Sequence, residues 1–253
     1  MAGHSHWASI KHKKGATDAK KGKAFSKIAR MITVAARKGG GQPDMNPKLQ
    51  LAIDKARAVN MPKDKIERAI QKGTGAGDNE TELFECIYEG YGPRGIALMV
   101  EILTDNKNRT PPEIRKIFER FGGNMGESGC VSWMFEKKGL IIVNSGNFSE
   151  DDIMELALNA GAEDLQKVGN IFQVTCSQAD LSKIKKAIES KNIQVESAEV
   201  SWIPKNNVDV EETAGRKVLG LMEALEEHDD VQNVYSNFNL PQSLLAEVQQ
   251  TSK

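Results

Sequence analysis

The sequence predicts an α+β protein of three domains: a small basic three-helix domain at the N-terminus, then two α+β sandwich domains, the third inserted in the second. Three observations support this prediction. The chain has 253 residues, which is enough for two or three domains. Apolar residues recur at helical spacing up to residue 73, whereas β-rich runs separated by turn residues prevail after residue 80. The charge of the chain changes from basic to acidic at the same place.

Three helices are expected in the basic domain. Residues 24–38 carry apolar residues at helical spacing and basic residues in the last turn, and a run of three glycines follows them. Asn46 and Pro47 form an N-cap followed by proline at the first helical position, so a second helix begins there and runs to about residue 60. A third helix begins after Pro62 and ends at Gly73.

The glycine-rich residues 73–79 are expected to be a flexible linker. A phosphate-binding loop does not fit, because the run follows a helix instead of a strand and lacks the order GxxxxGK[ST]. The linker therefore separates the helical part of the chain from a part in which strands prevail.

Strands and helices alternate after the linker. Residues 83–91 and 96–104 are β-rich and surround turn residues, which predicts a hairpin. The sequence TPPE at 110–113 is a capping-box pattern with proline at the first helical position, and it predicts a helix. Residues 131–143 predict a second hairpin, with its turn at Lys137-Lys138-Gly139. Further elements are expected at 149–160, 178–190 and 209–227 as helices, and at 163–168, 170–176, 194–203 and 231–237 as strands.

The order of these elements predicts an inserted domain. The middle block is long enough to close a sheet of its own, and the elements on either side of it can complete each other. Both domains would be ferredoxin-like sandwiches with helices on one face of a sheet. The expected boundaries are 1–78 for the basic domain with its N-terminal arm, 79–130 plus 204–240 for the second domain, 131–203 for the inserted domain and 241–253 for a C-terminal tail.

The composition indicates a globular protein, with 39% hydrophobic and 27% charged residues. No apolar run approaches the roughly 20 residues that cross a bilayer, and no apolar segment follows the charged N-terminus as in a secretory signal. A basic organellar leader has a similar composition, but no arginine precedes Arg30. Cys86, Cys130 and Cys176 are far apart and form no CxxC pair, which indicates reduced thiols. We therefore expect a cytoplasmic protein with no membrane partner.

Charge is distributed very unevenly along the chain. Residues 1–78 contain 17 lysines and arginines and 6 aspartates and glutamates, a net charge of +11. Residues 79–253 contain 17 and 29, a net charge of −12. A polyanion such as nucleic acid is therefore expected to contact the first third of the chain, and the acidic remainder should repel it. The acidic run at 223–230 is expected to be a solvated or protein-contacting surface.

The first candidate site is the cationic N-terminal arm together with the helix that follows it. Lysine binds phosphate without reading bases, so this segment should give affinity with little sequence specificity. Its histidine and tryptophan rings can stack on unpaired bases, which favours RNA or distorted DNA. A solvated tail is the alternative. The expected nucleic-acid contacts are Lys11, Lys13, Lys14, Lys20, Lys21, Lys23, Lys27, Arg30, Arg37, Lys38, His6, Trp7 and His12.

The second candidate site is the polar loop at 105–109. Arg109 can clamp a phosphate with two hydrogen bonds, and Asn106 and Asn108 can bond bases or backbone. An ordinary turn before a helix is the alternative, since Asn and Asp favour turns.

Catalysis is not expected. No Ser/His/Asp or Cys/His arrangement can be assembled from local signals, and the many carboxylates are spread over helix faces. His6 and His12 lack the tetrahedral partners of a zinc site. The sequence therefore predicts no catalytic residue, metal, cofactor or small-molecule substrate.

The chain resembles the YebC/PmpR family, whose mitochondrial members are translational activators of cytochrome oxidase. The resemblance rests on MAGHSHWASIKHKK at 1–14, AARKGG at 35–40, PDMNP at 43–47, ARAVNMPKD at 56–64, EGYGP at 89–93 and LTDNKNRT at 103–110. It implies the three-domain layout with an inserted third domain, and a cytoplasmic location. The family is usually described as probable DNA-binding transcriptional regulators, and members have also been tied to the ribosome, where they aid translation of proline-rich stretches. One departure is Pro111-Pro112, where we associate small or polar residues with the family and expect unchanged geometry.

The sequence thus predicts a non-enzymatic nucleic-acid-binding regulatory protein, in the first place a DNA-binding transcriptional regulator. The alternative is a ribosome-associated translation factor that binds ribosomal RNA. The basic domain shows no recognition helix with base-reading Arg, Asn or Gln at its start, which favours recognition of shape or of RNA. The expected partners are therefore DNA or ribosomal RNA, and the ribosome. A pure protein-interaction scaffold would leave the +11 of the first domain unexplained.

Overall fold

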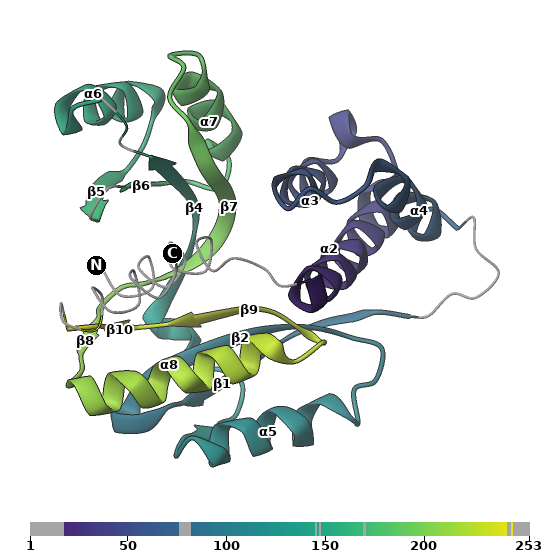
Figure 1. Cartoon of the computed structure of the whole chain (residues 1–253), viewed down its shortest axis with the longest axis vertical. Helices are drawn as coiled ribbons and strands as arrows, with labels where there is room; N and C mark the ends of the chain where they lie inside the picture. Colours follow the sequence, from purple (N-terminus) through teal and green to yellow (C-terminus); the bar gives the residue numbers. More distant parts are fainter. Residues whose placement is uncertain are drawn as a thin grey trace. The chain divides into compact units, whose positions relative to one another are not determined.

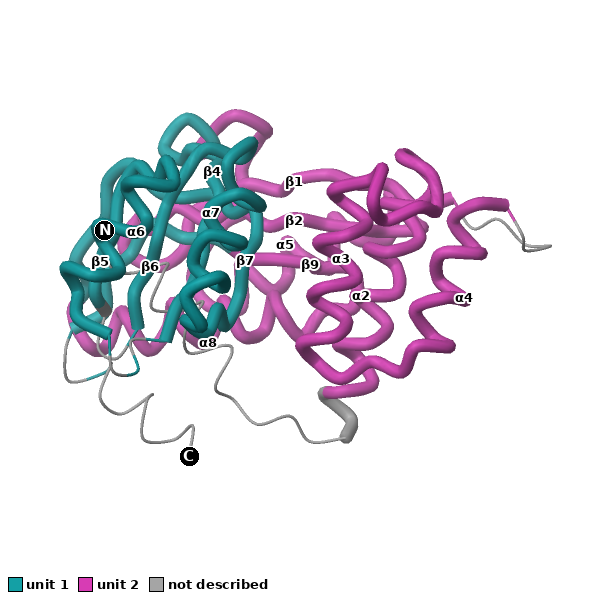
Figure 2. Tube along the Cα trace, turned by 90° about the horizontal axis from the view of Figure 1, so that it is seen from above, with its two compact units in different colours: residues 1–13, 132–210, 235–253 teal, residues 14–131, 211–234 magenta. Residues whose placement is uncertain are grey.

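The computed structural model describes residues 18–75, 82–144, 146, 148–168, 171–241 and 244, and Figure 1 labels their helices and strands. These residues form two compact units (Figure 2). Unit 2 runs from the start of the described chain to Val131 and again from Glu211 to Val234. Unit 1 comprises Ser132–Val210 and the described residues from Tyr235 onward. None of the helices in the described part of the chain has the length and apolar character that a membrane crossing requires.

The basic part of unit 2 contains the three predicted helices, α2 (Asp18–Gly39), α3 (Pro47–Ala58) and α4 (Lys63–Gly73), with a short 3-10 turn η1 (Pro43–Met45) between the first two. α3 and α4 both pack on α2 (Figure 1). Their shared core is made of aliphatic side chains, among them Ile32, Leu49 and Ile66. α2 begins six residues before the predicted start, because the polar residues ahead of Ala24 are helix formers that carry no apolar pattern.

Asn46 ends one of these helices and begins the next. Its buried side chain donates from Nδ2 to the carbonyl oxygens of Ala35, at 2.8 Å, and Gly40, at 2.9 Å. Its Oδ1 accepts from the backbone N–H of Leu49 at 3.1 Å, as an N-cap does. A Cβ atom at Gly39 would lie 2.6 Å from Nδ2, so glycine is needed there. One side chain thus satisfies three backbone groups that helix ends leave without partners.

Replacing Asn46 with alanine should lower the free energy of unfolding by about 2–3 kcal/mol, because three hydrogen bonds to the backbone are lost and two of them are buried. Urea denaturation followed by circular dichroism measures the loss. Asn46→Asp is the control, since a carboxylate keeps the acceptor for Leu49 but cannot donate to the two carbonyls. Full stability of the aspartate variant would show that the two carbonyl bonds contribute nothing.

The rest of unit 2 is a four-stranded sheet in the order β3-β1-β2-β9. β1 (Phe84–Tyr91) and β2 (Ala97–Thr104) form the predicted hairpin, with Phe84 opposite Thr104. The other strands are β3 (Asn124–Met125) and β9 (Val231–Ser236). Two helices, α5 (Thr110–Arg120) and α8 (Glu212–Glu227), cover the same face of this sheet (Figure 1). The chain therefore returns after residue 210 to complete a sheet that it began before residue 131, as the sequence predicted.

Unit 1 has the ferredoxin-like order βαββαβ. β4 (Phe135–Asn144), β5 (Asp164–Val168), β6 (Ile171–Cys176) and β7 (Val195–Pro204) form a sheet in the order β5-β6-β4-β7. α6 (Glu150–Ala160), which starts at the capping box of Ser149, and α7 (Leu181–Glu189) pack against each other and on this sheet. A 3-10 turn η3 (Ser132–Met134) precedes β4, and a short parallel pair, β8 (Val208–Asp209) with β10 (Phe238–Asn239), follows the sheet in sequence. The predicted α+β class is confirmed.

One predicted hairpin is wrong. Residues 135–144 are a single strand, which runs straight through Lys137-Lys138-Gly139. Gly139 pairs with Cys176 on one side and Val200 on the other. A Cβ atom there would lie 2.6 Å from the sulfur of Cys176, so this glycine marks a close approach within a sheet and not a turn.

The edges of the units lie at residues 131/132, 210/211 and 234/235, and the basic helices fall in the same unit as their neighbouring sheet. The finer boundaries after residues 78, 130, 203 and 240 remain a proposal of three domains.

Candidate nucleic-acid interface

Most of the predicted cationic arm lies outside the described residues. Six of the expected contacts lie outside the described residues: His6, Trp7, Lys11, His12, Lys13 and Lys14. The side chain of Lys20 is also outside them. The others all lie on α2: Lys21, Lys23, Lys27, Arg30, Arg37 and Lys38. The structure therefore describes the surroundings of the contacts predicted on α2, and the predicted contacts of the arm lie outside the described residues.

Two of the α2 cations contact the carboxyl end of α8, and a third contacts the residues just after it. Lys23 Nζ donates to the carbonyl oxygen of Glu227 at 3.3 Å, and Lys27 Nζ donates to that of Glu226 at 2.5 Å. Arg30 lies on the same face of α2, because residues 23, 27 and 30 are spaced by about one helical turn. The last carbonyls of a helix lack partners and carry the negative end of its dipole. This face of α2 is therefore bound within the chain, where the sequence predicted phosphate contacts.

Asp230 is the centre of a buried polar cluster at the same place. Its carboxylate is only 1% exposed and accepts hydrogen bonds from four side chains. Arg30 Nη1 donates to Oδ1 at 2.9 Å, and Arg109 Nη2 donates to Oδ2 at 2.8 Å. The hydroxyls of Thr110, at 2.8 Å, and Thr104, at 3.1 Å, also donate to Oδ2. One carboxylate thus ties together α2, the end of β2 and the start of α5.

The hydrogen bonds decide the charge of Asp230. Burial by itself raises the pKa of this carboxyl group, but the bonds from Arg109, Thr110, Arg30 and Thr104 outweigh burial and lower the pKa from 3.8 to about 2. The group is therefore ionised at neutral pH. The expectation that 223–230 is a solvated acidic surface is wrong for this residue, because Asp230 directly precedes β9 and points into the protein.

The polar loop at 105–109 is held mainly by its own side chains. Asn106 Oδ1 accepts the backbone N–H groups of Asn108 and Arg109, both at 3.0 Å, so Asn106 forms a turn. The predicted capping box at 110–113 is wrong: Thr110 is already helical and its hydroxyl bonds Asp230. Arg109 binds Asp230 and also Asp105, at 3.1 Å, while its side chain stays 45% exposed. The structure therefore places Asn106 in a turn and Arg109 on carboxylates, and leaves Asn108 exposed.

The predicted contacts near the two ends of α2 lie in different environments. Lys38 forms an ion pair with Glu85 of β1, and both side chains are about half exposed. Arg37 keeps Nε and Nη2 buried without a hydrogen-bond partner. Lys21 is exposed in the first turns of α2.

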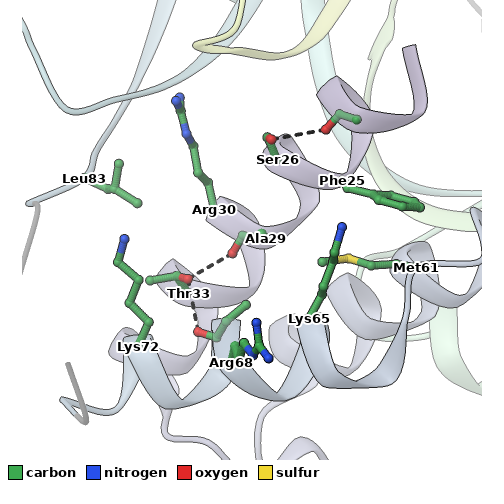
Figure 3. A pocket seen from close by; sticks show the side chains of 12 residues that line it. Phe25, Ser26, Ala29, Arg30, Thr33, Met61, Lys65, Arg68, Lys72 and Leu83 are labelled. Carbon is green, nitrogen blue, oxygen red and sulfur yellow. Dashed lines mark hydrogen bonds between the residues drawn. The ribbon is translucent and has the colours of Figure 1, made fainter. Parts of the chain in front are cut away.

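A groove of about 350 Å³ lies between α2 and α4 (Figure 3). Its floor is apolar and includes Phe25 and Met61. Three cations from α4, Lys65, Arg68 and Lys72, line it together with Arg30, and the lining residues that the structure describes include no aspartate or glutamate. We call this feature the α2–α4 groove.

The α4 cations of the groove were not among the predicted contacts. Their spacing is the signal that would have found them, since residues 65, 68 and 72 share one face of a helix. Lys65 lies over the ring of Phe25, with Nζ 5.2 Å from the ring centroid. Arg68 is 3.8 Å from Asp64 and 79% exposed, and an exposed pair of this kind holds its partner only weakly. These side chains can therefore turn to an outside anion at little cost.

A metal centre is absent from the described residues, which contain no group of three or more His, Cys, Asp and Glu side chains placed to hold an ion. The three cysteines form no disulfide.

The sequence and structure are similar to those of known proteins. A family model for the TACO1/YebC N-terminal domain matches residues 5–76, and one for the TACO1/YebC second and third domain matches residues 83–238. A probable transcriptional regulatory protein of Halothermothrix orenii is 51% identical over 251 residues, covering 98% of this chain and 99% of that protein. One of Desulfatibacillum aliphaticivorans is 51% identical over 247 residues, covering 98% and 100%. The crystal structure of a conserved hypothetical protein from Aquifex aeolicus matches with a TM-score of 0.84 and 46% identity, covering 93% of this chain and 97% of that one.

Proposed function

This chain belongs to the TACO1/YebC family, and from that premise we propose that it is a regulatory protein that binds nucleic acid through its basic helices and catalyses no reaction. The observation that carries the proposal is the α2–α4 groove, which three exposed cations of α4 line, whereas its fourth cation, Arg30, is already paired with Asp230. An electropositive groove attracts polyanions and raises their rate of association. The names of the relatives, probable transcriptional regulatory proteins, support a regulatory role.

A DNA-binding transcriptional regulator is our first candidate, because the relatives are named probable transcriptional regulatory proteins and such regulators commonly act on DNA. The second candidate is a ribosome-associated translation factor that binds ribosomal RNA. A helix that reads duplex DNA presents free amide or guanidinium groups near its start, and the starts of α3 and α4 do not. This difference favours the second candidate. The side-chain amide of Asn46 already bonds the backbone at the end of α2 and at the start of α3. Gln50 Nε2 donates to Asp54 at 2.9 Å, so its amide is also bound within the chain. For the location we propose the cytoplasm, because the three cysteines form no disulfide and cytoplasmic proteins keep their thiols reduced.

Binding of nucleic acid by the purified chain should weaken as salt rises. With three lysine or arginine contacts to phosphate, log Kobs against log salt concentration should have a slope of about −2 to −3, since each contact contributes about 0.7–0.9. Fluorescence anisotropy over a range of potassium chloride concentrations measures this slope. A flat line, or no binding at low salt, would contradict the proposal.

Ultraviolet crosslinking in cells separates the two candidates. Recovery of ribosomal RNA would support the translation factor, and recovery of promoter DNA would support the transcriptional regulator. Recovery of neither, from cells in which the chain is abundant, would contradict both.

A further inference from the structure

We infer that the α2–α4 groove holds one unpaired nucleotide of a single-stranded or looped nucleic acid, with the base on the apolar floor and its phosphate among the α4 cations. The inference rests on the proposed function and names the form of nucleic acid that the site takes.

The size and floor of the groove fit a base and not a duplex. A volume of about 350 Å³ lies in the range of pockets that enclose one small ligand, roughly 300–1,000 Å³. The floor is formed by Phe25, Ala29 and Met61. An intact duplex presents phosphates and base edges, and neither gains from an apolar floor. The face of an unpaired base does gain, because bases stack on aromatic rings.

Phe25 is placed to give that stacking surface. Its half-buried ring packs against the core of the three helices and also lines the groove. Figure 3 shows Lys65 reaching from α4 toward this ring and Lys72 reaching toward Leu83, at different ends of the groove. A base on Phe25 would therefore have cations on both sides to receive its phosphates.

The polar groups of the floor are already used, which predicts little discrimination among bases. Thr33 Oγ1 donates to the carbonyl oxygens of Ala29, at 2.9 Å, and Ala69, at 3.1 Å. Ser26 Oγ donates to the carbonyl oxygen of Gly22 at 3.1 Å. The hydroxyl protons of Thr33 and Ser26 are therefore donated within the chain, so we expect stacking and charge to contribute more to binding than hydrogen bonds to base edges.

The test compares wild type with Phe25→Leu, in which leucine keeps the apolar packing but removes the ring. The probes are a single strand of about 12 nucleotides and the matched duplex, both followed by fluorescence anisotropy. Loss of one stacking contact should weaken single-strand binding roughly fivefold to a hundredfold and leave duplex binding within about twofold. Equal losses for the two probes, or an unchanged affinity for the single strand, would overturn the inference.

A second measurement uses the wild-type chain alone, so it does not depend on the folding of the variant. A single strand with 2-aminopurine at its centre should lose fluorescence on binding if its base stacks on a ring, and an unchanged emission would count against stacking. Free adenosine monophosphate should not displace the strand at equal concentration; if it does, the groove is a mononucleotide site and the inference is overturned. Binding of neither the strand nor the duplex would overturn the proposed function itself, whereas equal binding of both would overturn only this inference.

Discussion

Replacing Asp230 with asparagine should lower the free energy of unfolding of unit 2 by about 2–3 kcal/mol. The carboxylate is 1% exposed and accepts hydrogen bonds from Arg30, Arg109, Thr104 and Thr110. Asparagine has one oxygen in place of two and no charge, so two guanidinium groups lose their counter-ion. Both arginines are partly exposed and can turn to water, which keeps the expected cost below that of a fully buried pair.

The neighbouring Asp229 supplies a matched control. Its side chain is 70% exposed and lies 3.8 Å from Lys23, so Asp229→Asn should change stability by less than about 0.5 kcal/mol. Urea denaturation measures both variants, and hydrogen exchange should assign the loss at Asp230 to α2, the end of β2 and the start of α5. Equal stability of the two variants would show that the buried cluster is not a tie between these elements.

The same carboxylate predicts how stability depends on pH. The pKa of Asp230 is about 2 in the folded chain and near 3.8 when the group is free, so its contribution is present above about pH 4 and is lost as the pH falls toward 2. The difference corresponds to about 2 kcal/mol. Wild type should therefore lose more stability than Asp230→Asn between pH 5 and pH 2.5, and parallel curves would contradict the assignment.

Replacing Lys65, Arg68 and Lys72 together with alanine should weaken nucleic-acid binding on the order of a hundredfold at about 0.1 M salt, because each lost phosphate contact costs roughly five- to eightfold there. The three side chains are exposed on one face of α4, so the variant should stay folded. The matched control replaces Lys183, Lys186 and Lys191, three exposed lysines on and just after α7 in unit 1. The control should bind like wild type, and an equal loss in both variants would show that binding follows net charge and not the groove.

Local signals predicted much of the fold. Asn46 followed by Pro47 located the start of α3, and the glycine run after Lys38 located the end of α2, because caps and breakers act within a few residues. The return of the chain into the first sheet was predicted from the order of elements alone. Gly139 was misassigned as a turn because a glycine that makes room for Cys176 has the same local sequence appearance as one that bends the chain.

The site was less predictable, because its contacts join distant parts of the chain. Lys23, Lys27 and Arg30 were assigned to phosphate on charge alone, yet they contact residues about 200 positions away at the end of α8 or just after it. Nothing in the sequence around Asp230 distinguishes it from the exposed acids beside it. The α4 cations, in contrast, were within reach of sequence reasoning, since their spacing on one helix face is visible without a structure.

The salt dependence of binding by the Lys65, Arg68 and Lys72 triple variant tests the central claim most directly. If these side chains contact phosphates, the slope of log Kobs against log salt concentration should be shallower than that of wild type by about 2–2.7, while the α7 control keeps the wild-type slope. Equal slopes for wild type and the α4 variant would contradict the account, because nucleic acid would then bind elsewhere on the chain.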